Sequence, residues 1–153
     1  MINITRIKDI REDNDLTQEQ MSKILNIKRS AYSLWEIGVS IIPLNYLSDF
    51  ADYFNLSVDY VLGLTNNRNI KTIKGLDFKT LGDNIKTLRI KNNLSQLALS
   101  KMLNVSQACI VRWEKAQIKI TVSNLYKISK LFHISLNDLC GKSYIPNKAS
   151  VTS

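Results

Sequence analysis

Residues that commonly carry out catalysis or bind metals are few in this sequence and stand far apart. His133 is the single histidine, and the two cysteines, Cys109 and Cys140, have no partner at CxxC spacing. The sequence also lacks a glycine-rich phosphate loop and a carboxylate pair at a repeated spacing. We therefore expect no enzyme, no metal site and no cofactor, and we interpret the cysteines as packing residues and His133 as a capping or turn residue.

Other residues recur at fixed spacing, because the chain contains one unit of about sixty residues twice without a gap. A shift of 78 positions places Ile7 on Ile85 and Trp35-Glu36 on Trp113-Glu114, and about 17 of the 57 positions from 7 to 63 are identical. We therefore expect two copies of one fold. We assign residues 1–64 to the first domain, 65–76 to a linker, 77–141 to the second domain and 142–153 to a tail that we expect to be disordered.

The composition fits small helical domains and gives the two copies opposite charges. Only five glycines and two prolines accompany 44% apolar residues, which argues against a β-rich fold. Residues 1–64 contain six Lys and Arg against nine Asp and Glu, a net charge of −3, whereas residues 81–141 contain nine against three, a net of +6. No stretch approaches the ~18 apolar residues of a membrane span, and no signal peptide is evident, so we expect a cytoplasmic protein with no membrane partner.

Capping residues and apolar spacing predict five short helices in each copy, and therefore an all-α fold class with two tandem five-helix domains. In the first copy, Thr17 and Gln20 form a capping box, and Asn26 ends the second helix in a left-handed turn. A third helix covers residues 28–37, Pro43 begins a fourth and Ser57 caps a fifth. Equivalent N-caps in the second copy are Asp77, Ser95, Ser106, Thr121 and Ser135.

The same spacing predicts which side chains face the core of the first copy. The predicted inward residues of the first three helices are Ile4, Ile7 and Ile10, then Met21, Ile24 and Leu25, then Ala31, Tyr32 and Trp35.

The middle of each copy closely resembles the signature of lambda-repressor-like domains, the XRE or Cro/CI-type helix-turn-helix family. The matching segments are LTQEQMSKILNIKRSAYSLWEIG and LSQLALSKMLNVSQACIVRWEKA, followed by the similar tails LSVDYVLG and ISLNDLCG. The resemblance covers residues 4–64 and 80–141. It implies that the second helix of each copy lies across the DNA backbone and the third enters the major groove. It therefore implies a sequence-specific regulator of transcription that binds double-stranded DNA, most often a repressor, from a bacterium or a phage.

Carried over residue by residue, the resemblance assigns base reading to three positions of each third helix. They are Arg29, Ser30 and Leu34 in the first copy and Gln107, Ala108 and Arg112 in the second. Gln107 suits adenine, Ala108 a thymine methyl and Arg112 the O6 and N7 of guanine, whereas Leu34 offers only apolar contact. The plainer interpretation is that Arg112 and Lys119 are solvated surface residues and that Gln107 only supports the helix N-terminus.

The resemblance also implies residues that hold the DNA backbone or the fold. Gln18 and Gln96 would bind phosphate and brace the third helix, and further phosphate contacts would come from Lys28, Ser106, Lys115 and Lys119. Two further pairs match a structural salt bridge of the family, Arg11 with Glu36 and Arg89 with Glu114.

Two arrangements remain open at this point. In one, the tandem copies act as their own pseudo-dimer on half-sites one helical turn, ~34 Å, apart, which a linker with an r.m.s. span of ~20 Å and a limit near ~40 Å permits. In the other, which is antitoxin-like, the acidic first copy dimerises or binds a protein partner through an apolar stretch, and only the second copy contacts DNA. That stretch contains Ile37, Val39, Ile41 and Ile42, of which Ile42 is expected to pack in the core.

Overall fold

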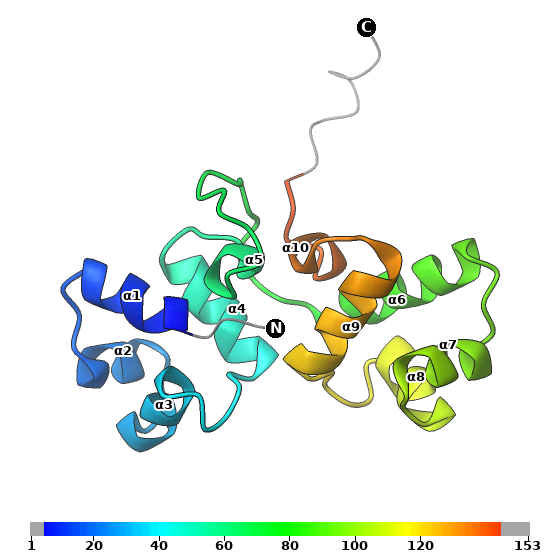
Figure 1. Ribbon diagram of the computed structural model, residues 1–153, viewed down its shortest axis with the longest axis horizontal. Coiled ribbons are helices and arrows are strands. Elements are labelled where there is room, and N and C mark those ends of the chain that lie inside the picture. Colours follow the sequence, from blue (N-terminus) through cyan, green and yellow to red (C-terminus); the bar gives the residue numbers. More distant parts are fainter. Residues whose placement is uncertain (1–4, 145–153) are drawn as a thin grey trace, which may run out of the picture.

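A computed structural model of the chain describes residues 5–144 as ten α-helices in two units that lie side by side (Figure 1). The N-terminal unit contains α1 (Thr5–Asp13), α2 (Gln18–Ile24), α3 (Arg29–Glu36), α4 (Leu44–Tyr53) and α5 (Val58–Val61). The C-terminal unit contains α6 (Phe78–Lys91), α7 (Gln96–Leu103), α8 (Gln107–Glu114), α9 (Val122–Phe132) and α10 (Leu136–Leu139). This is the predicted all-α fold of two five-helix units. Ile4 and most of the predicted tail lie outside the described residues.

Helix boundaries follow the capping chemistry of the sequence. Thr17 Oγ1 accepts a hydrogen bond from the Gln20 amide while Gln20 Oε1 accepts one from the Thr17 amide, which is the expected capping box. Asn26 and Asn104 have φ of +56° and +55°, the left-handed conformation that ends α2 and α7. Each predicted hydroxyl N-cap after Thr17 bonds the amide three residues on, as seen at Ser57, Ser95, Ser106, Thr121 and Ser135.

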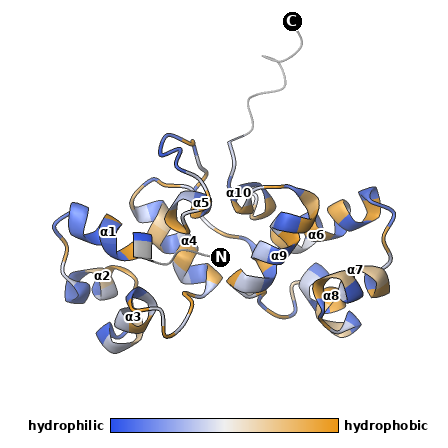
Figure 2. Ribbon diagram, in the orientation of Figure 1, coloured by the Kyte–Doolittle hydropathy of each residue, from blue (hydrophilic) through white to orange (hydrophobic). Residues whose placement is uncertain are grey.

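Each unit buries an apolar interior formed by all of its helices, and Figure 2 shows the apolar residues concentrated on their inner faces. Ile7, Met21 and Tyr32 are fully buried, as expected from their spacing. Two inward assignments were wrong: Ile24 is 37% exposed and Ala31 is exposed. Both lie at the margin of the apolar stripe of a short helix, where one residue's rotation of about 100° decides between core and solvent.

The units meet along a seam in which α5 and α10 exchange equivalent contacts. The Asp59 carboxylate accepts hydrogen bonds from the Leu136 and Asn137 amides, both at 2.8 Å, at the start of α10. Asn137, which occupies the equivalent position, accepts a bond from the Val58 amide at the start of α5 (3.3 Å). Each unit therefore caps a helix of the other, and the two units are related by an approximate twofold axis through this seam.

The linker and the start of the tail also belong to the seam. Thr72 forms an isolated antiparallel bridge with Ser143, and the Lys142 side chain is buried in the N-terminal unit. Lys142 and Ser143, assigned above to the tail, therefore contact the linker and α4, and the expected disorder of the tail stays a prediction. Among residues 5–144, no helix is long and apolar enough to span a membrane.

Candidate nucleic-acid interface

The third helix of each unit, α3 and α8, lies on the same edge of the molecule, at the bottom of Figure 1. Each follows its preceding helix, α2 or α7, through a tight turn that the left-handed asparagine makes possible. In the C-terminal unit Gly82 lets α6 approach the end of α8 closely, since a Cβ there would stand 2.4 Å from the Trp113 carbonyl oxygen. Cores and close contacts thus fix α3 and α8 while leaving their outer faces free.

A buried ion pair joins the end of the third helix of each unit to the first helix of that unit. Arg11 bonds both Glu36 oxygens through Nε (2.6 Å) and Nη2 (3.1 Å), and its Nη1 donates to the Leu16 carbonyl (2.7 Å). Arg89 holds Glu114 in the same way at 2.8 and 2.9 Å. The two pairs implied by the resemblance are therefore present, and their place inside each unit gives them a structural role.

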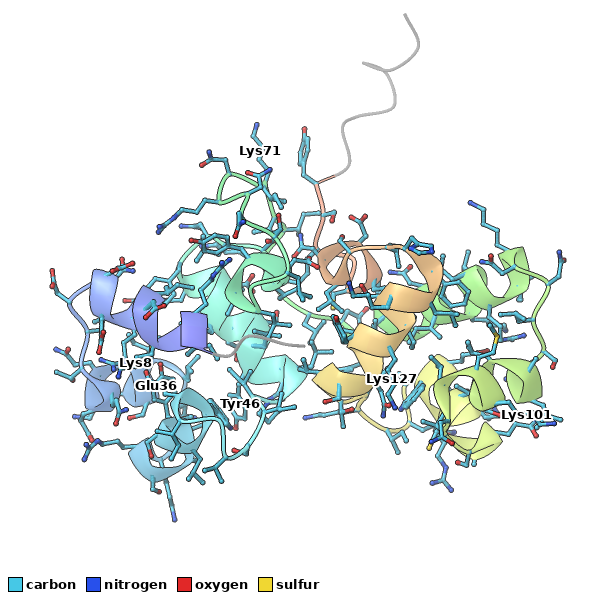
Figure 3. All side chains as sticks on the ribbon, viewed as in Figure 1. Lys8, Glu36, Tyr46, Lys71, Lys101 and Lys127 are labelled. Carbon is cyan, nitrogen blue, oxygen red and sulfur yellow. The ribbon has the colours of Figure 1, made fainter. Side chains whose placement is uncertain are left out.

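Gln18 and Gln96 join these ion pairs from the start of the second helix. Gln18 Nε2 donates to Glu36 Oε2 at 2.8 Å, and Gln96 Nε2 donates to Glu114 Oε1 at 3.4 Å. Burial alone would raise the pKa of Glu36, but the bonds from Arg11 and Gln18 outweigh it, and the pKa lies below its ordinary value. Figure 3 labels Glu36 beside α1, where this charge is enclosed. Both glutamines thus brace the third helix as the resemblance implies.

The six residues assigned to base reading lie on the outer faces of α3 and α8. Gln107, Ala108 and Arg112 are exposed, whereas Ile110 and Trp113 on the opposite side of α8 are 0% and 5% exposed. In the N-terminal unit Arg29 and Ser30 are exposed and Leu34 is 39% exposed. The fold therefore gathers each predicted set on one surface that a DNA groove can reach, and whether these residues read bases stays a prediction.

The residues assigned to phosphate stand around the same edge. Lys28, Lys115 and Lys119 are exposed, and the Lys119 ammonium lies 5.8 Å from the centre of the Phe78 ring. Ser106 is already used within the protein, because its hydroxyl accepts from the Cys109 amide and donates to the Cys109 sulfur, each at 3.2 Å. Of this set, Lys28 and Lys115 have exposed side chains available for phosphate, whereas Lys119 would have to leave the Phe78 ring to reach one.

Four equivalent positions along this edge differ in chemistry between the units. The N-terminal unit exposes four apolar side chains, which we call the apolar strip: Leu34 (39%), Ile37 (69%), Val39 (70%) and Ile41 (45%). The C-terminal unit has Arg112, Lys115, Gln117 and Lys119 at the same positions. Sequence reasoning had not singled out Gln117, although the alignment of the copies places it opposite Val39. Ile42 and Ile120 are buried, as expected.

Comparison with known proteins gives the class of this chain. A helix-turn-helix family model matches residues 7–61 and again residues 85–139. The chain therefore belongs to the helix-turn-helix family and carries two copies of its domain. This confirms the predicted resemblance, and it agrees with the expectation that the chain is not an enzyme.

Similar proteins include one regulator known from its sequence and two of solved structure. YobD of Bacillus subtilis, an uncharacterized HTH-type transcriptional regulator, is 35% identical over 66 residues, which are 43% of this chain and 59% of YobD. The restriction-modification controller protein C.AhdI of Aeromonas hydrophila is 22% identical over 41% of this chain and 96% of its own, with a TM-score of 0.39. The P22 c2 repressor, solved with a synthetic operator, is 34% identical over 39% of this chain and 89% of its own, with a TM-score of 0.37. The match to YobD thus spans little more than half of that relative's length.

Proposed function

We propose that this protein is a sequence-specific regulator of transcription that binds double-stranded DNA with α3 and α8 in neighbouring major grooves. The carrying observation is the seam, in which Asp59 and Asn137 cap each other's units and hold both third helices on one edge of the molecule. Two family domains in this arrangement form a covalent pseudo-dimer suited to half-sites one helical turn apart. The name of the relative YobD, a transcriptional regulator, supports the same function.

The operator has unlike halves in this proposal, because the two reading faces carry different side chains. Gln107, Ala108 and Arg112 offer bidentate hydrogen bonds and a methyl contact, so the half-site under α8 carries most of the sequence information. Arg29 and Ser30 read the other half-site, where Leu34 adds apolar contact only. We assign the protein a repressor's role in the cytoplasm of a bacterium or in a phage-infected cell.

A second candidate function rests on the apolar strip. Exposed apolar side chains stand where the C-terminal unit has three cations and Gln117, and the N-terminal unit has a net charge of −3. Contiguous apolar surface commonly marks a protein contact. In this alternative the N-terminal unit dimerises or binds a protein partner, and the C-terminal unit alone holds DNA.

Selection of bound duplexes from a random pool by the full chain separates the two candidates. The pseudo-dimer selects a bipartite site with unlike halves at one fixed separation. The alternative selects a single half-site, or a palindrome of two identical α8 half-sites if two chains assemble. Recovery of random sequence only would reject specific DNA recognition altogether.

A further inference from the structure

Lys142 is a cation from the end of the C-terminal unit that lies buried inside the N-terminal unit. Its Nζ donates to Ser48 Oγ (2.9 Å) and Asp52 Oδ1 (2.7 Å) of α4 and to the Gly75 carbonyl (2.7 Å) of the linker. The Lys142 side chain is 1% exposed, and these three acceptors match the three hydrogens of an ammonium group. The burial of this charge is therefore fully compensated by partners from the other unit and the linker.

The backbone of Lys142 extends the same connection. Its carbonyl oxygen accepts hydrogen bonds from Thr72 Oγ1 (3.1 Å) and from the Ile73 amide. One residue thus fastens three segments that are distant in sequence: α4, the linker and the end of α10. A movement of one unit relative to the other would have to extract the ammonium and leave the Asp52 carboxylate without its cation, with only the Gly75 amide (2.7 Å) still donating to it.

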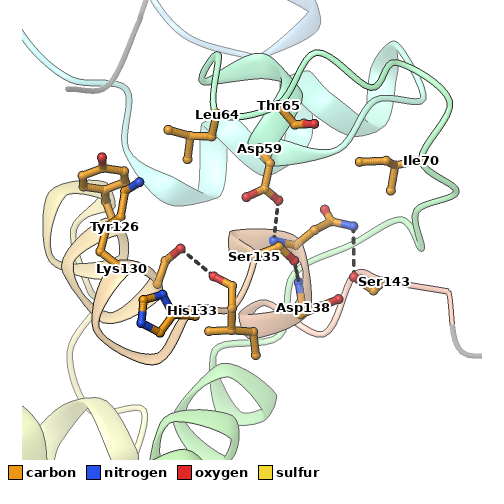
Figure 4. Close-up of a pocket in the computed structure, with 13 residues that line it drawn as sticks. Asp59, Leu64, Thr65, Ile70, Tyr126, Lys130, His133, Ser135, Asp138 and Ser143 are labelled. Carbon is orange, nitrogen blue, oxygen red and sulfur yellow. Dashed lines mark hydrogen bonds between the residues drawn. The ribbon is translucent and has the colours of Figure 1, made fainter.

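The connection made by Lys142 has no counterpart on the other side of the approximate twofold axis of the seam. Leu64 occupies the position equivalent to Lys142, and it faces Tyr126 and Lys130 where Lys142 faces Ser48 and Asp52. Figure 4 shows that side of the seam, where a cavity of about 420 Å³ remains. A lysine at this position is therefore not a repeated feature of the two domains. Its contacts join the two units and do not belong to the core of either one.

We propose that Lys142 is a positioning residue that fixes the orientation of α3 relative to α8 and thereby the separation of half-sites that the protein accepts. This rests on the proposed binding of a bipartite operator. Two linked DNA-binding units increase each other's affinity only when the distance and orientation between them match the spacing of the two half-sites. A one-sided buried connection restricts that geometry, so the protein discriminates between operators by spacing as well as by base sequence.

The test uses the full chain and the double variant Lys142→Met/Asp52→Asn, which removes both charges so that neither stays buried without a partner. Lys130→Met, an exposed change at the equivalent of Asp52, is the matched control. Affinity is measured on the selected operator and on versions with one or two base pairs added to or removed from the spacer. We expect the unchanged chain and the control to prefer the selected spacing by about tenfold or more, and the double variant by about twofold or less. A double variant that keeps the tenfold preference would overturn the proposal.

A measurement without DNA separates the failure of this proposal from the failure of the proposed function. Spin labels at Ser30→Cys and Ala108→Cys report the distance between α3 and α8, with Cys109→Ala and Cys140→Leu copying the equivalent residues of the N-terminal unit. We expect one narrow distance distribution, which becomes at least about twofold broader when the Lys142 and Asp52 changes are added.

Equal widths of the two distance distributions would refute the positioning role even if the protein binds DNA. A broadened distribution, together with an unlabelled and unchanged chain that binds no duplex, would refute the DNA-binding function and leave the positioning role standing. Loss of helical circular dichroism in the double variant would also overturn the proposal, because the pair would then belong to the fold.

Discussion

Equivalent residues of the two units have kept their structural roles and lost their common surface chemistry. Arg11, Glu36 and Gln18 repeat as Arg89, Glu114 and Gln96 with the same hydrogen bonds. On the outer face the agreement ends, since the exposed Arg112 stands where Leu34 stands in the other unit. The first group holds the third helix of each unit to the rest of its fold, whereas the second group lies on the exposed surface.

Substitutions of Arg112 and Lys119 should distinguish a base-specific contact from a phosphate contact. Arg112→Ala should weaken operator binding by about 1–3 kcal/mol and relax the preference at one base pair, because a bidentate contact to guanine discriminates by that much. Lys119→Ala should weaken binding to operator and scrambled duplex alike and reduce the salt slope by about one unit. Both variants are measured on both duplexes. Equal losses for Arg112→Ala on the two duplexes would make Arg112 a phosphate contact and reject it as a base-reading residue.

Helices and caps were the elements most accessible from sequence, and the seam was the least. Hydroxyl N-caps and left-handed asparagines act within a few residues of the chain, so Thr17, Ser135 and Asn26 predicted boundaries that the structure contains. The seam depends on residues 77 or more positions apart, and Asp59 resembles any surface carboxylate until α10 is placed beside it. Lys142 was assigned to a tail for the same reason, because its three partners are tertiary contacts.

The Asp59 carboxylate, which caps α10 of the other unit, should make the free energy of unfolding depend on pH. Burial raises the pKa of Asp59 above its ordinary value, although the amides of Asn137 and Leu136 oppose that rise. A raised pKa means that its stabilising contribution is complete below the unfolded pKa of about 3.9 and is lost as pH rises through the folded pKa. Asp59→Asn should therefore gain stability relative to the unchanged chain as pH rises from about 4 to 7.

Thermal unfolding of the two proteins across that pH range checks this. At pH 7 the free energies of unfolding should differ by less than about 1 kcal/mol, since a lost amide hydrogen bond and a relieved buried charge offset each other. A melting-temperature difference that stays constant with pH would show that Asp59 contributes no titrating charge at the seam.

At the scale of the whole molecule, the two units carry opposite net charges, while their third helices lie on one edge. Residues 1–64 carry a net charge of −3 and residues 81–141 a net of +6, although their helices are arranged alike. The sequence gives this asymmetry directly, whereas the common direction of α3 and α8 comes from the seam. DNA bound along this edge would therefore be held unevenly, most strongly at the C-terminal unit.

Introducing cations into the apolar strip should make the two units bind DNA with more equal strength. Ile37→Lys/Ile41→Lys copies Lys115 and Lys119 at two exposed positions, so the fold should tolerate both changes. We expect tighter binding to every duplex and a salt slope steeper by about two units, one for each added phosphate contact. The control Tyr53→Lys/Ile73→Lys adds the same charge at exposed apolar positions outside the strip. An equal change in slope for the control would attribute the effect to net charge and would place the strip away from the DNA.

The presence of both units on one chain has a consequence for dosage. A regulator that assembles from two separate chains loses its DNA-binding form on dilution, and its operator occupancy depends on roughly the square of the chain concentration when dimers are scarce. Here α5 and α10 meet within one chain, so the pairing of the two units does not depend on the concentration of the protein. If the protein binds its operator as a single chain, as proposed, occupancy should rise in simple proportion to protein level at low occupancy, without the threshold of a two-chain dimer.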